Sequence, residues 1–230
     1  MNNKQLPRRI LQYAAGLVCM AVGLVLLKRM SYGTVSSFGV SPITALPDAV
    51  ANITPLTLGN ASILLHALCV IAQIIVQKKV TLKSILCMCV GIPFGKLVDW
   101  FMLFWNPASF TIPQLIISLV LGIAVQGFGV ALINGCDMML PAPDELNAVI
   151  CRVHGKKLSN VKMCADAAYV LLALVINLLT WLFNRECFSL SIGINSVASV
   201  LLTGRFIGLT FRLLPGVRMT PFFNINECRD

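Results

Sequence analysis

The chain has 230 residues, of which 57% are hydrophobic and only 12% are charged, and its formal net charge is +9. Soluble domains usually contain about 45–50% apolar and about 25% charged residues, so a soluble core of this size would not enclose so much apolar surface. The composition therefore excludes an ordinary soluble protein. It predicts an all-α integral membrane protein that is surrounded mainly by the lipid bilayer.

Six segments are long and apolar enough to cross the hydrocarbon layer of a bilayer, which takes about 20 helical residues. In chain order, the predicted spans are Ile10–Leu27, Asn60–Gln77, Leu82–Trp105, Ile112–Asn134, Val161–Phe183 and Phe188–Leu213. No small-residue cleavage pattern follows the first span, so we expect it to remain as an uncleaved anchor. Within the third span, Gly91 and Pro93 predict a break or a kink in the helix.

Basic residues are distributed unevenly between the two sides that six spans define. They gather near the N-terminus, in the connectors around 78–83 and 152–162, and near the C-terminus, all of which fall on one side. Under the positive-inside rule this side is the cytoplasm. We therefore expect a multi-pass protein of the bacterial cytoplasmic (inner) membrane with both termini in the cytoplasm. The net charge then reflects topology, and we expect no nucleic-acid partner.

The two halves of the chain resemble each other. Matched positions keep their order: Gly16, Gly23, Leu46, Leu58, Asn60 and Gly95-Lys96 in the first half, then Gly122, Gly129, Leu146, Leu158, Asn160 and Gly204-Arg205 in the second. We predict two three-helix repeats, at 1–106 and 107–230, within one membrane domain. Three spans are an odd number, so the repeats are inverted, as in many secondary transporters. A duplication that records only evolutionary origin is the alternative.

Each repeat also contains a long connector with a short helix in it. Ser41 followed by Pro42 is an N-cap and a favoured first helical residue, and Pro143 with Asp144 places an acid in a first turn, where the helix dipole favours it. At about 10 residues these helices are too short to span, so each is either re-entrant or interfacial. The free N–H groups of a re-entrant helix are suited to an anionic group of a solute.

Several strings in the chain resemble the YczE/YyaS/YitT family of bacterial integral membrane proteins. They are GCDMMLPAPDELNAVI at 135–150, GKKLSNVKMCAD at 155–166, GVSPITALPDAV at 39–50, LTLGNAS at 56–62 and GIPFGKLVD at 91–99. The resemblance implies a multi-pass inner-membrane protein of the kind described as a transporter or permease of unassigned substrate, and it supplies no binding residues. One departure is Ile92, which separates a glycine and a proline that related sequences often have adjacent.

Ionisable side chains inside the hydrocarbon are costly and usually face a cavity or a partner. Lys96 and Asp99 are spaced i,i+3 on one helix face and can pair, although Lys96 can also snorkel to the interface. His66 and Asp166 occupy equivalent positions and suit proton coupling, unless His66 is an ordinary core residue. The predicted solute and ion pathway comprises His66, Lys96, Asp99, Asp137, Asp144, Asp166 and Arg205.

The sequence favours a small-solute transporter with a central polar site between the repeats. The solute is unknown, and the short helices suggest an anionic one. The alternative is a non-transporting membrane subunit, such as a substrate-capture component or an assembly partner, acting as a homodimer or with an accessory protein. We expect neither an enzyme nor a cofactor or metal, because no nucleophile elbow, phosphate loop or HExxH motif is present and the nine cysteines form no ligand pattern.

Overall fold

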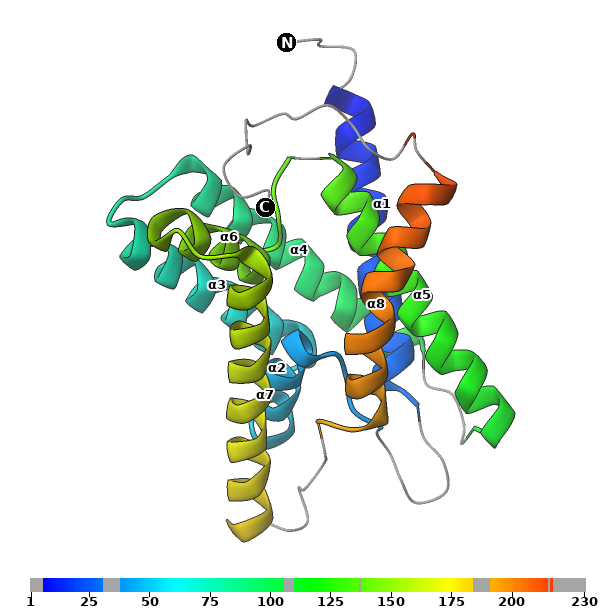
Figure 1. Ribbon diagram of the computed structural model, residues 1–230. Helices are drawn as coiled ribbons and strands as arrows, with labels where there is room; N and C mark the ends of the chain where they lie inside the picture. The colour runs from blue at the N-terminus through cyan, green and yellow to red at the C-terminus, as the bar shows by residue number, and fades with distance from the viewer. Residues whose placement is uncertain are drawn as a thin grey trace.

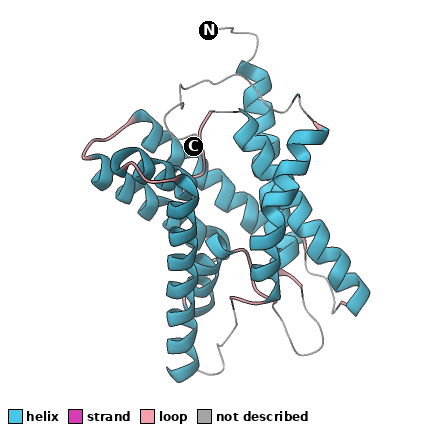
Figure 2. Cartoon of the chain, in the orientation of Figure 1, coloured by secondary structure: helices cyan, strands magenta, loops and turns pink. Residues whose placement is uncertain are grey.

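The computed structural model describes residues 6–30, 38–105, 110–136, 138–183, 191–214 and 216, without the side chains at 158 and 159. Helices and loops make up this part of the chain, as Figures 1 and 2 show. In chain order the helices are α1 Leu6–Lys28, α2 Pro42–Ile53, α3 Leu58–Gln77, α4 Leu82–Phe104, α5 Ile112–Cys136, α6 Ala142–His154, α7 Leu158–Phe183 and α8 Ile194–Leu213.

Six of these helices are long and apolar enough to cross a membrane, namely α1, α3, α4, α5, α7 and α8. They correspond to the six predicted spans, so the prediction of a multi-pass membrane protein is confirmed. Large apolar side chains such as Leu171, Val175 and Leu178 are exposed on these helices, where lipid tails rather than protein would cover them. The two shorter helices, α2 and α6, fall within the predicted connectors.

Helix α4 contains the two residues that predict a break or a kink in the third span. It continues through both Gly91 and Pro93, so the helix is not broken there. The ring of His66 lies against Gly91, where a Cβ atom would come within 2.9 Å of the His66 Cβ. The glycine therefore allows close packing with α3 while the helix stays intact.

Helices α1 and α5 cross at the centre of the bundle through small residues. A Cβ atom on Gly16 would lie 3.0 Å from the Gly129 carbonyl oxygen, and one on Gly23 would lie 2.8 Å from the Gly122 carbonyl oxygen. Because the earlier glycine on α1 faces the later one on α5, the two helices are antiparallel. Their backbones approach so closely that only glycine fits.

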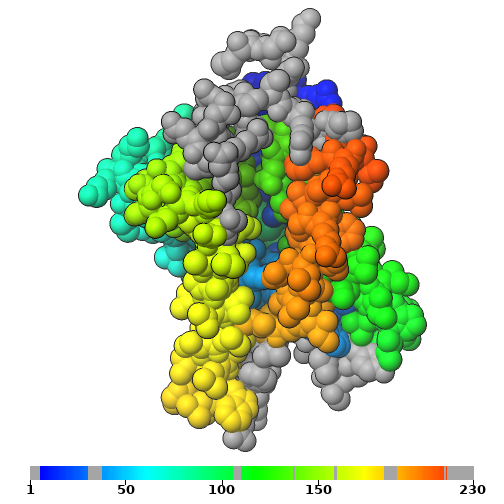
Figure 3. Space-filling view, in the orientation of Figure 1, coloured from blue at the N-terminus to red at the C-terminus, as the bar shows by residue number. Residues whose placement is uncertain are grey.

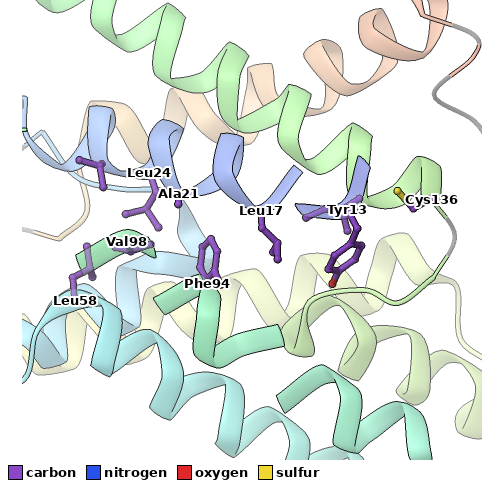
Figure 4. Packing of buried hydrophobic residues seen from close by; sticks show 10 residues of the cluster. Tyr13, Leu17, Ala21, Leu24, Leu58, Phe94, Val98 and Cys136 are labelled. Carbon is purple, nitrogen blue, oxygen red and sulfur yellow. The ribbon is translucent and has the colours of Figure 1, made fainter. Parts of the chain in front are cut away.

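An apolar core forms where α1 and α5 meet α4. Tyr13, Leu17, Ala21 and Leu24 project from α1, with Phe94 and Val98 from α4 facing them, as Figure 4 shows. Around this core, α8 packs on α5, α3 on α4, α6 on α3, and α2 on both α3 and α7. These contacts place both short helices between longer ones, with the apolar residues of their first turns largely covered and Ile53 and Val153 at their C-terminal ends exposed.

The second half of the bundle is open where the first is closed. Helix α3 packs closely against α4, whereas in the described part α7 contacts α2 and α6 and does not pack against α8. Figure 3 shows the resulting hollow between α7 (yellow) and α8 (orange), with atoms of α2 (blue) visible at its floor. On α8, a Cβ atom at Gly204 or Gly208 would meet no described atom within 4 Å.

Candidate functional site

The first turns of the two short helices reach a buried group of side chains between α3 and α7. We call this group the central cluster. Its buried members and the residues packed against them include Leu65, Cys69 and Val70 of α3, Cys87 of α4, Ala142 and Leu146 of α6, Tyr169 of α7, and Ile43 and Leu46 of α2. Five helices therefore meet at one place. Two of them, α2 and α6, present their N-terminal halves to it.

Cys69 and Tyr169 connect the two halves of the molecule within the central cluster. Their Sγ and Oη atoms are 3.5 Å apart, and the two residues are 100 positions apart in sequence. The same separation relates Asn60 to Asn160 and Leu58 to Leu158. The contact thus joins residues that are equivalent in the predicted duplication.

Polar side chains hold the beginning of each short helix inside the bundle. The Nε2 atom of Gln73 in α3 donates to the Ala142 carbonyl oxygen at 2.9 Å, and Ala142 is completely buried. In the other half, Asn195 Nδ2 donates to the Gly39 carbonyl oxygen at 3.0 Å, and the Ser196 hydroxyl donates to the Val40 carbonyl oxygen. At the beginning of each short helix, buried backbone carbonyls are therefore satisfied by side chains of other helices.

His66 is buried on α3, one turn before Cys69. Its Nδ1 atom lies 2.8 Å from the Ser62 carbonyl oxygen, and its ring centroid is 5.9 Å from that of Phe94. Asp144, in the first turn of α6, is near enough to interact with it electrostatically. The predicted site residue His66 therefore adjoins the central cluster, with a carboxylate in range.

Asp144 and Asp166 lie together on the side of the cluster that α6 and α7 form. Lys162 Nζ donates to Asp144 Oδ1 at 2.6 Å. Asp166 lies one turn beyond Lys162 on α7, is half-buried, and interacts electrostatically with both Lys162 and Asp144. Asp144, at the start of α6, therefore interacts electrostatically with two other predicted site residues, His66 and Asp166.

A second carboxylate of α6 was not singled out by the sequence analysis. Glu145 is only 1% exposed and accepts ion pairs from Lys83 Nζ at 2.9 Å and Arg152 Nη2 at 2.7 Å. Lys83 belongs to the first turn of α4, so the pair fixes α6 against α4. From the sequence alone, Glu145 is an acidic residue in a first helical turn, where the helix dipole stabilises it. Nothing near it in sequence indicates its partner Lys83, which lies 62 positions earlier.

Helix α2 also contains a buried carboxylate that the sequence analysis did not predict as a site residue, that of Asp48. Its carboxylate is completely buried, and Oδ1 lies 2.7 Å from Lys28 Nζ at the end of α1. Among the described residues, Oδ2 has no hydrogen-bond partner. A short-range signal was present in the sequence, since Asp48 follows Pro47 within an apolar segment, but nothing local indicates the Lys28 partner.

Lys96 and Asp99 lie elsewhere and have other partners than the predicted pairing. Lys96 Nζ donates to Asn60 Oδ1 at 2.9 Å. Asp99 accepts from the Thr57 hydroxyl at 2.7 Å and from the Gly59 N–H at 2.8 Å. Both side chains of α4 therefore fasten the first turn of α3, and Asp99 neutralises the positive end of that helix.

The remaining predicted residues are distributed as follows. Arg205 is exposed on α8, and Asp137 lies outside the described residues. Ser41 is the N-cap of α2 and Pro42 its first residue, as predicted, but the Ser41 hydroxyl contacts Thr44 Oγ1 at 2.9 Å and caps no N–H group. Pro143 is buried in the first turn of α6.

Some buried polar atoms near these helices have no protein partner within the described ranges. They include both amide atoms of Asn147 on α6, Asn177 Nδ2 on α7 and Asp48 Oδ2 on α2. Asn147 is 1% and Asn177 is 4% exposed. Buried groups of this kind are usually satisfied by water or a ligand, so the bundle interior has polar capacity beyond its own contacts. The described residues contain no group of three His, Cys, Asp or Glu side chains suited to a metal.

Six long apolar helices around two short, inwardly held ones define a polytopic helical membrane protein. The chain belongs to a family of unknown function (DUF6198), whose model matches residues 7–212. No curated protein and no solved structure matches the chain.

Proposed function

We propose that the protein is a small-solute transporter built from two inverted repeats, with its solute site at the central cluster. In this view α2 and α6 are re-entrant helices that enter from opposite sides and bring their first turns to the site. The membrane is the bacterial cytoplasmic membrane, and both termini lie in the cytoplasm. The resemblance to the YczE/YyaS/YitT family agrees with this assignment and remains part of the proposal.

The observation that supports the proposal is a set of contacts that stay the same when each residue is replaced by its equivalent in the other repeat. Gly16 faces Gly129 while Gly23 faces Gly122, and Cys69 contacts its own equivalent, Tyr169. A two-fold axis between the halves produces this pattern, because it maps the first glycine pair onto the second and exchanges Cys69 with Tyr169. The packing of α3 on α6 and of α7 on α2 follows the same exchange. Inverted repeats with a site on their axis are typical of secondary transporters.

The charges around the central cluster support coupling of the solute to protons. His66 and Asp166 are equivalent positions of the two repeats, and both interact with Asp144. His titrates near neutral pH, and a carboxylate in a partly apolar surrounding is suited to gain and lose a proton as its surroundings change. Together with Lys162, these groups form a chain of titratable side chains beside the first turn of α6.

The test begins with ligand binding. Detergent-purified protein is heated with single members of a panel of amino acids, carboxylates, phosphate compounds and nucleobases. A specific ligand raises the unfolding temperature in proportion to the logarithm of its concentration. The protein is then placed in liposomes that contain a pH-sensitive dye, and the ligand found in the first step is added under a proton gradient.

The expected result is proton movement that requires both protein and ligand. Asp166→Asn should abolish that movement while binding persists, because the amide keeps the shape of the carboxyl group and cannot carry the proton. Asp99→Asn is the matched control, since Asp99 caps α3 and should leave proton movement per solute unchanged. Equal proton movement by Asp166→Asn and the native chain would remove the coupling role.

A non-transporting membrane subunit is the second candidate, and the exposure of α7 favours it. Apolar side chains project from this helix on several faces, including Leu172, Leu174 and Leu179. A partner protein would cover such a helix as well as lipid does. A subunit of this kind would show ligand-dependent thermal stabilisation but no flux in liposomes without its partner.

A further inference from the structure

The contact between α3 and α4 is built from three pairs of facing residues. Gly59 and Gly95 bring the backbones together, because a Cβ atom on Gly95 would lie 2.5 Å from the Gly59 carbonyl oxygen. Lys96 donates to Asn60 at 2.9 Å, and Gly91 accommodates His66. The contact therefore combines a small-residue surface with one charged hydrogen bond at its edge.

Part of this contact recurs in α7 and α8, although Ser159 replaces Gly59 and Val200 replaces Gly91. Asn160 corresponds to Asn60, and Gly204-Arg205 corresponds to Gly95-Lys96. In the structure Asn160 and Arg205 are both exposed, and Gly204 faces no described atom within 4 Å. Figure 3 shows a hollow between the two helices. The second repeat thus carries some of the residues of a helix contact that it does not make here.

We propose that the protein has a second conformation in which the start of α7 approaches α8 as α3 approaches α4, at a wider separation because Ser159 stands where the first repeat has Gly59. In it, Gly204 meets the first turn of α7, Met163 covers it as Ile63 covers Gly95, and Arg205 donates to the Asn160 side-chain oxygen. The inference rests on the inverted repeats of the proposed function. It identifies the hollow between α7 and α8 as the access path of the conformation described here.

Two features of the fold make this closure feasible. Helix α7 rests on α2 largely through Ala45, Ala49 and Ala173, which are completely buried and present a shallow contact surface. Helices can slide over such a surface by small shear movements. On α8, the exposed glycine face needs no side chain to be displaced before another helix approaches, so closure repacks few existing contacts.

Closure is tested by crosslinking in a chain whose nine native cysteines are replaced by serine or alanine. The pair Met163→Cys with Gly204→Cys corresponds to the touching residues Ile63 and Gly95. A short bifunctional thiol reagent is applied in liposomes, and the linked peptides are identified by mass spectrometry. The control pair is Met163→Cys with Leu202→Cys, because Leu202 lies on the face of α8 that packs toward α1 and α5.

We expect an intramolecular link for the first pair and at least tenfold less for the control. Folded protein without a link, links of equal yield in both pairs, or a product of twice the mass would each overturn the inference. The last result would show that the α8 glycines face a second copy of the chain. A link in protein that transports none of the tested solutes would support closure and count against the proposed function alone.

A double-mutant cycle in the native chain covers the case in which the cysteine-free chain does not fold. Asn160→Ala and Arg205→Ala are measured singly and together by thermal unfolding. The reference cycle is Asn60→Ala with Lys96→Ala, whose partners are 2.9 Å apart. Closure predicts that the effects of Asn160→Ala and Arg205→Ala are non-additive, as in the reference cycle. Strictly additive effects alongside a coupled reference cycle would overturn it.

Discussion

Glu145 is the residue whose removal should cost the fold most among the charged side chains of α6. Its buried carboxylate joins Lys83 of α4 to Arg152 of its own helix. Glu145→Gln would remove the negative charge that pairs with Lys83, whose side chain is only 18% exposed. We expect a loss of about 1–3 kcal/mol, reduced from the value for a fully buried pair because Arg152 reaches solvent. Thermal or denaturant unfolding in detergent measures it.

Asp144→Asn is the matched comparison on the neighbouring residue. The pair of Asp144 with Lys162 is partly exposed, with 48% of the lysine side chain accessible. Exposed ion pairs contribute about 0–1 kcal/mol, so this variant should be nearly as stable as the native chain. If Asp144→Asn destabilised the protein as much as Glu145→Gln, burial would not be what distinguishes the two pairs.

At the residue scale, the sequence located the charged positions better than their partners. His66 and Asp166 were predicted as equivalent positions from the duplication, and both lie within range of Asp144. The pairing of Lys96 with Asp99 was suggested by helix spacing, but each instead bonds to the start of α3. Local spacing shows which groups share a face, whereas long-range packing decides which neighbour is nearer.

At the scale of single elements, Gly23 on α1 provides a sharp test of the central crossing. A Cβ atom there would lie 2.7 Å from the backbone nitrogen of Gln126 and 2.8 Å from the Gly122 carbonyl oxygen. Backbone atoms cannot turn aside as a side chain does, so Gly23→Ala should separate α1 from α5 and cost about 1–3 kcal/mol. Unfolding of the purified protein measures the loss.

Gly208 on α8 is the matched control, since nothing lies within 4 Å of its added Cβ. In a helix, alanine is favoured over glycine by about 0.8–1.0 kcal/mol, so Gly208→Ala should be neutral or stabilising. Opposite signs for the two substitutions are expected. A similar loss in both would show that helix α8 is covered in the membrane by something other than lipid.

The extents of the long helices followed from hydropathy, while those of the short ones followed from their end signals. Ser41-Pro42 marked the beginning of α2 correctly, because an extended residue before a proline suits a helix start. Gly91 and Pro93 do not interrupt α4, and Gly91 instead allows close packing against His66 of α3. The inward position of α2 and α6 had no local signal, because it depends on Asn195, Ser196 and Gln73 from distant helices.

At the scale of the whole molecule, the two halves differ in packing, because α3 packs on α4 whereas α7 does not pack on α8 in the described part. Their sequences do not predict this difference. Both carry the glycine and cation of the same helix contact, yet only α3 and α4 make it. A duplicated sequence indicates which contacts are available to both halves. It does not indicate which half is closed in a given conformation, because that depends on the balance between two packings of similar free energy.

The orientation in the membrane is the last property to be tested at this scale. In the proposed inverted arrangement, the α2–α3 connector and the α6–α7 connector precede equivalent helices, so we expect them on opposite sides. The basic residues Lys156 and Lys157 assign the α6–α7 connector to the cytoplasm. In intact cells, a membrane-impermeant maleimide should therefore label Leu56→Cys directly and Lys156→Cys only after permeabilisation.

Both positions are exposed in the structure, so the reagent can reach each of them once it is on the right side. The cysteine-free chain provides the background, because native Cys89 and Cys164 are exposed on spanning helices. Labelling of Lys156→Cys in intact cells with protection of Leu56→Cys would reverse the orientation and leave the fold unaffected. Labelling of both in intact cells would contradict the inverted arrangement itself, since the two connectors would then share one side.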